Sequence, residues 1–176
     1  AYDYMDGTHN NYGVHSVKLF VDSIEVFCST VDGFLPDENR MINAWTDYEE
    51  YVTKTSWYMR SQVLPGNSWR MLQANEKGGV VTIDEERDYH FHYELEDLYG
   101  NARSYSFVVK GKPQIIEPFH PEGKNFLRWN QQNVVWDLGL ELTIPEGMLY
   151  EDVELNYVLR RDSDAISYEY QLHHVP

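Results

Sequence analysis

The sequence lacks most of the features on which catalytic, nucleic-acid-binding and membrane proteins depend. It contains a single cysteine, Cys28. A lone cysteine cannot form an internal disulfide, so cysteine pairing does not define a redox compartment, and a small buried hydrophobic residue is its expected role. No apolar run approaches the roughly 18 residues that a membrane-spanning helix requires. We therefore expect no membrane insertion.

Basic residues are also scarce. Fourteen lysines and arginines face 29 aspartates and glutamates, which gives a formal net charge of -15. Such a surface repels phosphate backbones and anionic lipids, and no cluster of lysine and arginine counters it. We expect no nucleic-acid partner.

Motifs that carry catalysis are missing as well. The sequence has no nucleophile elbow, no glycine-rich loop for phosphates and no paired-cysteine motif. Nothing in the spacing of its serines and histidines indicates a catalytic triad. The prediction is a chain that is not itself an enzyme and uses no cofactor.

Hydrophobic and aromatic residues, in contrast, are plentiful. They make up 42% and 15% of the 176 residues, and 14 tyrosines dominate the aromatic set. This content is enough for a packed core and suits β-strands. The length allows one large domain or two small ones.

Strict alternation of apolar and polar residues predicts two hairpins, because successive side chains of a strand point to opposite faces. Residues 16–21 and 24–28 alternate around a short turn at Asp22-Ser23. Residues 89–96 and 103–109 alternate around residues 97–101. In this second turn Asp97 is suited to accept backbone N–H groups, and Gly100 to adopt a positive φ.

The alternation stops at Lys110-Gly111-Lys112-Pro113 and resumes over residues 140–144, 153–159 and 166–172. We therefore predict an all-β fold of two β-sandwich modules, residues 1–112 and a smaller module of residues 113–176. Residues 37–57 fit two structures equally. Apolar residues three apart suit a short helical crossover, and an irregular connection between sheets is the alternative.

His90, His92 and Glu94 form the sharpest candidate metal site. Alternation places them on one strand face, an arrangement found in zinc sites, but a catalytic zinc needs a further converging protein ligand. A solvated polar face explains the same pattern, so we predict no bound metal. His9 reads as a loop residue, and adjacent His173 and His174 would point to opposite faces.

Calcium and glycans are further candidate ligands. Residues 84–86 and 94–97 are acidic, and Asp3, Asp6, Asn10 and Asn11 approach a calcium loop imperfectly. A solvated acidic surface is the simpler interpretation. Aromatic side chains suited to stack on sugar rings are Trp57, Trp69, Trp129 and Trp136, with Tyr51 and Tyr58 nearby. Core packing is the commoner fate of tryptophan.

Three stretches together resemble a known group of proteins. They are AYD and NYGVHSV within residues 1–17, RMIN and DY within residues 40–48, and TIDEERDYH, DLYGN and YSF within residues 82–107. The first resembles the second strand and turn of immunoglobulin-like modules. The combination resembles the region downstream of the catalytic domain in secreted bacterial zinc endopeptidases of the lysostaphin-like, cell-wall-cleaving type. The resemblance covers most of residues 1–112 and is weaker beyond them.

The resemblance implies two immunoglobulin-like modules, the first without a strand that would precede Ala1. In such enzymes a histidine and an aspartate of one motif and a histidine of a later His-x-His hold the zinc. The first motif is missing here, and His90-Phe91-His92 falls in the accessory region, so it receives no catalytic role. The open sheet edges make a homodimer a further expectation.

The implied function is that of a non-catalytic accessory region in a secreted cell-wall metallopeptidase-like protein, in the periplasm or at the cell surface. It would position or dock the catalytic domain, with that upstream domain, the cell wall or another protein as its partner. The alternatives are a glycan-binding β-sandwich module, a zinc hydrolase that uses His90 and His92, and a calcium-stiffened adhesive or structural module.

Overall fold

The computed structural model describes residues 3–4, 11–115, 117, 125–161 and 166–172. Strands account for 39% and helices for 11%, in open antiparallel sheets with no closed barrel among the described residues. This composition confirms the predicted all-β fold of the sandwich class. Two compact units are present: Ala1–Asp47, Tyr58–Val63 and Ser68–Ile116 form the first, and Tyr48–Trp57, Leu64–Asn67 and Glu117–Pro176 form the second.

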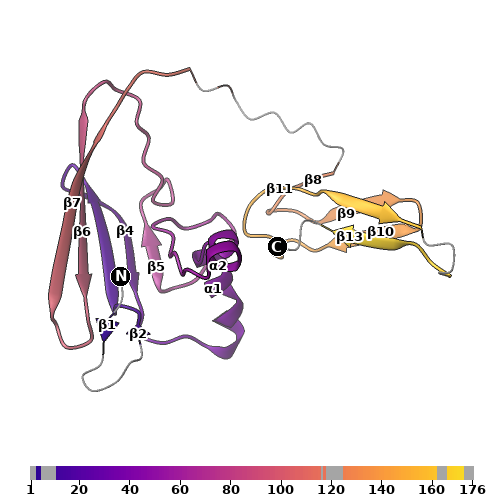
Figure 1. The fold of residues 1–176 in the computed structure, drawn as a ribbon, viewed down its shortest axis with the longest axis horizontal. Helices are drawn as coiled ribbons and strands as arrows, with labels where there is room; N and C mark the ends of the chain where they lie inside the picture. The colour runs from indigo at the N-terminus through magenta and orange to yellow at the C-terminus, as the bar shows by residue number, and fades with distance from the viewer. Residues whose placement is uncertain (1–2, 5–10, 116, 118–124, 162–165, 173–176) are drawn as a thin grey trace. The chain divides into compact units, whose positions relative to one another are not determined.

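A five-stranded antiparallel sheet is the main element of the first unit (Figure 1). In spatial order its strands are β5 (Leu72–Ala74), β4 (Ile24–Thr30), β3 (Ser16–Val21), β6 (Asp88–Glu96) and β7 (Ala102–Lys110). A short pair, β1 (Asp3–Tyr4) and β2 (Asn11–Tyr12), lies outside this sheet. The β3–β4 and β6–β7 pairs confirm both predicted hairpins.

The turn of the β3–β4 hairpin places two non-glycine residues at positive φ, Asp22 at 49° and Ser23 at 67°. This geometry matches the right-handed twist of the strands but is costly for residues with a Cβ. Asp22 offsets the cost through contacts to β6 and to Arg87, which directly precedes that strand: its carboxylate accepts the His90 N–H at 2.9 Å and an Arg87 N–H at 2.6 Å. The turn is thereby tied to the neighbouring strand.

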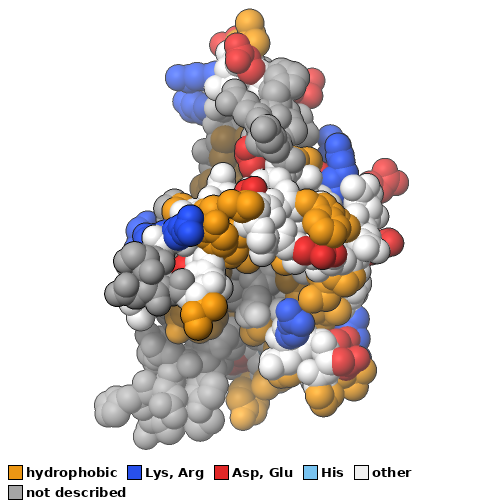
Figure 2. All heavy atoms as spheres, turned by 90° about the vertical axis from the view of Figure 1, so that its right-hand side faces the viewer, with side chains coloured by type: hydrophobic (Ala, Val, Ile, Leu, Met, Phe, Trp, Pro, Cys, Tyr) orange, Lys and Arg blue, Asp and Glu red, His pale blue; other side chains and the backbone are white. Residues whose placement is uncertain are grey.

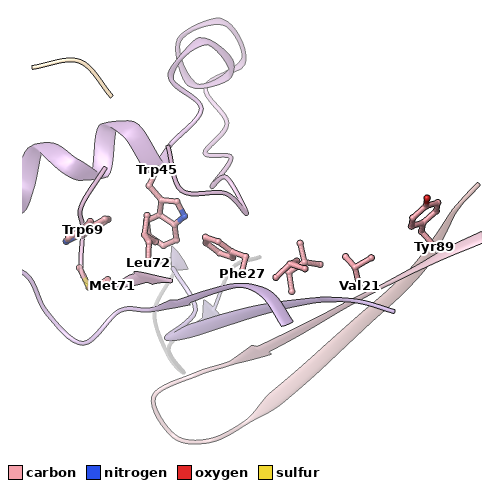
Figure 3. Packing of buried hydrophobic residues seen from close by; sticks show 9 residues of the cluster. Val21, Phe27, Trp45, Trp69, Met71, Leu72 and Tyr89 are labelled. Atoms are coloured by element: carbon pink, nitrogen blue, oxygen red, sulfur yellow. The ribbon is translucent and has the colours of Figure 1, made fainter. Parts of the chain in front are cut away.

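The core of the first unit lies on one face of the sheet. Figure 3 shows buried side chains of one cluster, spread from Trp69 at one end to Tyr89 at the other. Phe27 is the largest fully buried side chain. Trp45 packs edge-to-face on Trp69, with ring centroids 5.6 Å apart, and donates its indole N–H to the Arg60 carbonyl at 2.9 Å.

The segment of residues 37–57 is helical, so the first of the two predicted alternatives is correct. It contains a 3-10 helix (η1, Pro36–Met41) and two short α-helices, α1 (Ile42–Trp45) and α2 (Tyr48–Lys54). Trp45 anchors α1 to the core. Cys28 is buried, as expected, and forms no disulfide. No helix among the described residues is long and apolar enough to cross a membrane.

The described part of the second unit contains three two-stranded antiparallel sheets. They pair β8 (Phe126–Leu127) with β11 (Val153–Glu154), β9 (Asn133–Asp137) with β10 (Leu140–Ile144), and β12 (Tyr157–Arg160) with β13 (Glu169–Leu172). Leu127, Val135 and Leu155 form the buried centre.

The single strand predicted over residues 153–159 is wrong. It breaks between β11 and β12, because the two halves pair with different strands, β8 and β13. At the break, Leu155 is buried and donates its N–H to the Asn125 carbonyl at 3.0 Å. The predicted module boundary near residue 112 stays a prediction.

Candidate functional site

The first candidate site is an aromatic row on the β6–β7 hairpin. Phe91 and Tyr93 lie on β6, and their direct cross-strand partners on β7 are Phe107 and Tyr105. The Phe91 and Phe107 rings stack with centroids 5.0 Å apart, and the centroids of Tyr105 and Phe107 are 5.8 Å apart. We call these four residues the β6–β7 aromatic face.

Exposure increases from β6 to β7 along this face. Tyr89, which precedes the row, is 3% exposed, whereas Phe107 is 36% and Tyr105 64% exposed. On β6, the Tyr93 hydroxyl still forms a hydrogen bond with Ser61 at 2.9 Å. The protein therefore leaves stacked aromatic rings at the open edge of its sheet, and exposed apolar clusters of this kind mark interaction sites.

The tip of the same hairpin is held rigidly. The Asp97 carboxylate accepts the N–H groups of Tyr99 and Asn101, each at 2.8 Å, and the Asn101 side-chain amide at 2.7 Å. These hydrogen bonds lower the pKa of Asp97, chiefly through the Asn101 side chain. Gly100 adopts a φ of 84°. The predicted turn chemistry is confirmed, and it presents exposed Leu98 and Tyr99 to solvent.

The opposite face of β6 carries the candidate metal ligands. The His92 ring accepts or donates a hydrogen bond at Nδ1 with the Ser106 hydroxyl at 2.7 Å, and its Nε2 lies 3.5 Å from a Glu94 carboxylate oxygen. His90 is exposed two residues away. Among the described residues, no group of three or more His, Cys, Asp or Glu side chains is arranged to hold a metal. The absence of bound metal stays a prediction.

Members of both acidic clusters form local contacts. Glu85 pairs with Arg87 at 2.8 Å, Asp84 accepts the Tyr89 hydroxyl at 3.4 Å, and Asp97 is used by its own turn. The predictions on His9, His173 and His174 lie outside the described residues. So does most of the imperfect calcium loop around Asp6 and Asn10.

The tryptophans named as sugar-stacking candidates differ in exposure. Trp69 is buried and Trp129 half-buried, whereas Trp57, Tyr58 and Trp136 are exposed. These side chains do not form one sheet platform.

A smaller aromatic cluster lies at α2. The centroids of the Tyr51 and Trp57 rings are 4.2 Å apart, and Tyr48 lies 6.4 Å from Tyr51. Thr55, at a φ of 55°, donates its N–H to the Tyr51 carbonyl at 2.8 Å and ends the helix. This reversal allows Trp57 to return onto Tyr51. We call these three aromatic residues the α2 cluster.

The second unit contains a polar groove of about 470 Å³ that the sequence did not indicate. Its lining includes Asn125, Asp137, Glu154, Asn156 and Tyr157. The Tyr157 hydroxyl donates to the Asp137 carboxylate, and this bond raises the pKa of Tyr157. The groove offers hydrogen bonds to a polar ligand.

Acidic and basic side chains are intermixed on the face that Figure 2 shows. On the face drawn in Figure 2, acidic and basic side chains of the described residues lie scattered among hydrophobic and polar ones. No continuous basic patch covers the described part of that face.

Comparison with known proteins gives one finding. Residues 124–176 match the Zu5-like domain family, and this match is confined to the C-terminal part of the chain. Neither curated proteins nor solved structures give a match to the chain.

Proposed function

We propose that this chain is a non-catalytic accessory region of a secreted, cell-wall-cleaving zinc peptidase, and that it docks and positions the catalytic domain. In this proposal the protein acts in the periplasm or at the cell surface. The choice of the catalytic domain as the partner rests on the family resemblance of residues 1–17, 40–48 and 82–107. The single structural observation that supports docking is the β6–β7 aromatic face.

The chemistry of that face suits a protein partner. Tyrosine and phenylalanine rings give large apolar contact area with few rotatable bonds, so little conformational entropy is lost when a partner covers them. The cross-strand stacking of Phe91 on Phe107 holds the rings in place before binding. Tyr105, the most exposed of the four, is the expected centre of the contact.

The test measures binding between the chain and the lysostaphin-like catalytic domain of the same protein by calorimetric titration. Tyr105→Ser is expected to weaken binding at least tenfold, because it removes the exposed ring. Val108→Ser is the matched control. It removes an exposed apolar side chain from the opposite face of the same strand, and should leave the affinity unchanged.

Two results would contradict the proposal. One is the absence of any binding between the two proteins, and the other is an equal loss with both serine variants, which would indicate a general effect on β7. A functional readout complements the titration. Release of peptides from purified cell walls should require the catalytic domain, and the chain alone should release none.

A second candidate function, glycan binding, is supported by the α2 cluster. The Tyr51 and Trp57 rings lie close together, and both Tyr48 and Trp57 are exposed, so a sugar ring has aromatic surface to stack on. Co-sedimentation with purified peptidoglycan tests this function. If it is correct, Trp57→Ala reduces the bound fraction, whereas Tyr105→Ser does not. Equal retention of the wild type and Trp57→Ala would exclude the cluster as a glycan site.

A further inference from the structure

Among the described residues no strand pairs with the outer edge of β7, and this second feature of the first unit does not depend on the proposed function. β7 is the last strand of the sheet order and nine residues long, whereas the opposite edge strand, β5, has three (Figure 1). Every β7 residue except Val109 is exposed. Within it, residues 104–109 contain no charge, proline or glycine, so none of the usual devices that block edge-to-edge pairing is present there.

The direction of the free backbone groups follows from the hydrogen bonds of β6. His90 accepts the Asp22 N–H at 2.9 Å, so the main-chain groups of His90 face β3. Val108 lies opposite His90, and it must therefore direct its own N–H and C=O away from β6. Because this direction alternates along a strand, Ser104 and Ser106 also present their backbone groups at the free edge.

We infer that two copies of this chain pair antiparallel through β7, with Ser106 on the two-fold axis. This register is the one in which all nine residues overlap. It places Ser104 opposite Val108 of the second copy, and both residues offer outward backbone groups as the ladder requires. It also places Tyr105 of each copy opposite Phe107 of the other copy.

The side chains of β7 favour pairing with β7 of a second copy over pairing with an unrelated strand. Phe107 already stacks on Phe91, so Tyr105 of the second copy extends the aromatic row across four strands. The charged residues of β7, Arg103 and Lys110, fall opposite Val109 and Ala102, so no two like charges face each other directly. The strand is thus complementary to itself in backbone hydrogen bonding and in its aromatic side chains, and the register keeps its basic residues from facing each other directly.

The net charge of -15 on each copy opposes association at long range. Because salt screens this repulsion over distances beyond about 8–10 Å, the dimer fraction should rise with sodium chloride. A contact held mainly by surface ion pairs would show the opposite dependence.

Light scattering and sedimentation of the purified chain test the dimer. The wild type should dimerise in a concentration-dependent manner, and Ser106→Pro should be monomeric, because proline removes an outward N–H at the centre of the interface. Ser106→Ala is the control. It loses the same hydroxyl contact to His92 but keeps the N–H, and should dimerise like the wild type.

Disulfide trapping tests the register without relying on the fold of the proline variant. Under mild oxidation Ser106→Cys should cross-link with itself, because paired Cα atoms about 5.5 Å apart suit a disulfide. Ser104→Cys should not, since the two copies of residue 104 would lie about 13 Å apart. A monomeric wild type, a dimer that Ser106→Pro leaves intact with its fold retained, or equal cross-linking of both cysteine variants would overturn the inference.

Discussion

At the scale of single residues, Asp22 links the first hairpin to β6 by charge and backbone hydrogen bonds. The His90 N–H and then the Arg87 guanidinium lower the pKa of Asp22. A carboxyl whose pKa is lower in the folded than in the unfolded state stabilises the fold above its unfolded pKa of about 3.9. The contribution is lost as the pH falls through the folded pKa.

Asp22→Asn should therefore lower the melting temperature at pH 7 and have little effect at pH 2. Asparagine tolerates the positive φ of the turn and retains an acceptor for the His90 N–H, so the change isolates the charge. Thermal unfolding of the two proteins between pH 2 and 7 measures the difference. A melting-temperature gap that stays constant across this range would show that the Asp22 charge does not contribute.

Gly111 is required by close packing rather than by backbone freedom. It is buried, and it donates its N–H to the Arg87 carbonyl at 2.8 Å. A Cβ at this position would lie 2.0 Å from the Glu85 carbonyl oxygen. The sequence marked Gly111 only as a point where the sheet stops, because a contact with residues 85–87 is not visible in local pattern.

Gly111→Ala is expected to destabilise the protein by about 1–3 kcal/mol, the usual cost of overpacking. Gly13→Ala serves as the control, since a Cβ at Gly13 would meet nothing within 4 Å. Urea denaturation gives both values. Equal stability of the two variants would mean that the backbone around Glu85 yields easily.

At the scale of secondary-structure elements, local pattern predicts the long hairpins and fails for the short strands. Residues 16–28 and 89–109 alternate strictly, and each strand pairs with its neighbour in sequence, so the information is local. β9 was not predicted, because the three successive apolar residues Val134-Val135-Trp136 break the alternation of apolar and polar residues. β5 and β8 are too short to show a pattern, and distant partners define them.

For the candidate sites too, local pattern predicts only the features that neighbouring residues determine. Alternation correctly placed His90, His92 and Glu94 on one face and the aromatic residues of the hairpin on the other. It could not reveal that Tyr105 is exposed and Tyr89 buried, since this difference depends on how far the buried core extends across the sheet. The groove of the second unit is built from loops and three separate ladders, which leave no signature in sequence.

The core contribution of β4 is testable with one substitution. Phe27→Ala removes a ring that is 2% exposed and should cost about 3–5 kcal/mol. Ile24→Ala on the same strand removes an exposed side chain and should change the stability by about 0.5 kcal/mol or less. Urea denaturation compares them, and a loss below about 1 kcal/mol for Phe27→Ala would contradict the assigned core.

At the scale of the whole molecule, the chain combines two compact units with a strongly acidic composition. The predicted boundary near Lys112 can be tested directly. A fragment of residues 1–112 should unfold in a single cooperative transition, because it contains all five strands of the main sheet and its buried cluster. A fragment without cooperative unfolding would place the boundary elsewhere or make the units interdependent.

We propose that this chain contributes no catalysis of its own, and its zinc content together with its release of cell-wall peptides is the decisive readout. The purified chain and the double variant His90→Ala, His92→Ala are dialysed against zinc, analysed for bound metal, and incubated with purified cell walls. If the proposal is correct, both proteins bind substoichiometric zinc and neither releases peptides. One zinc per wild-type chain that is lost in the double variant, together with peptide release, would contradict it.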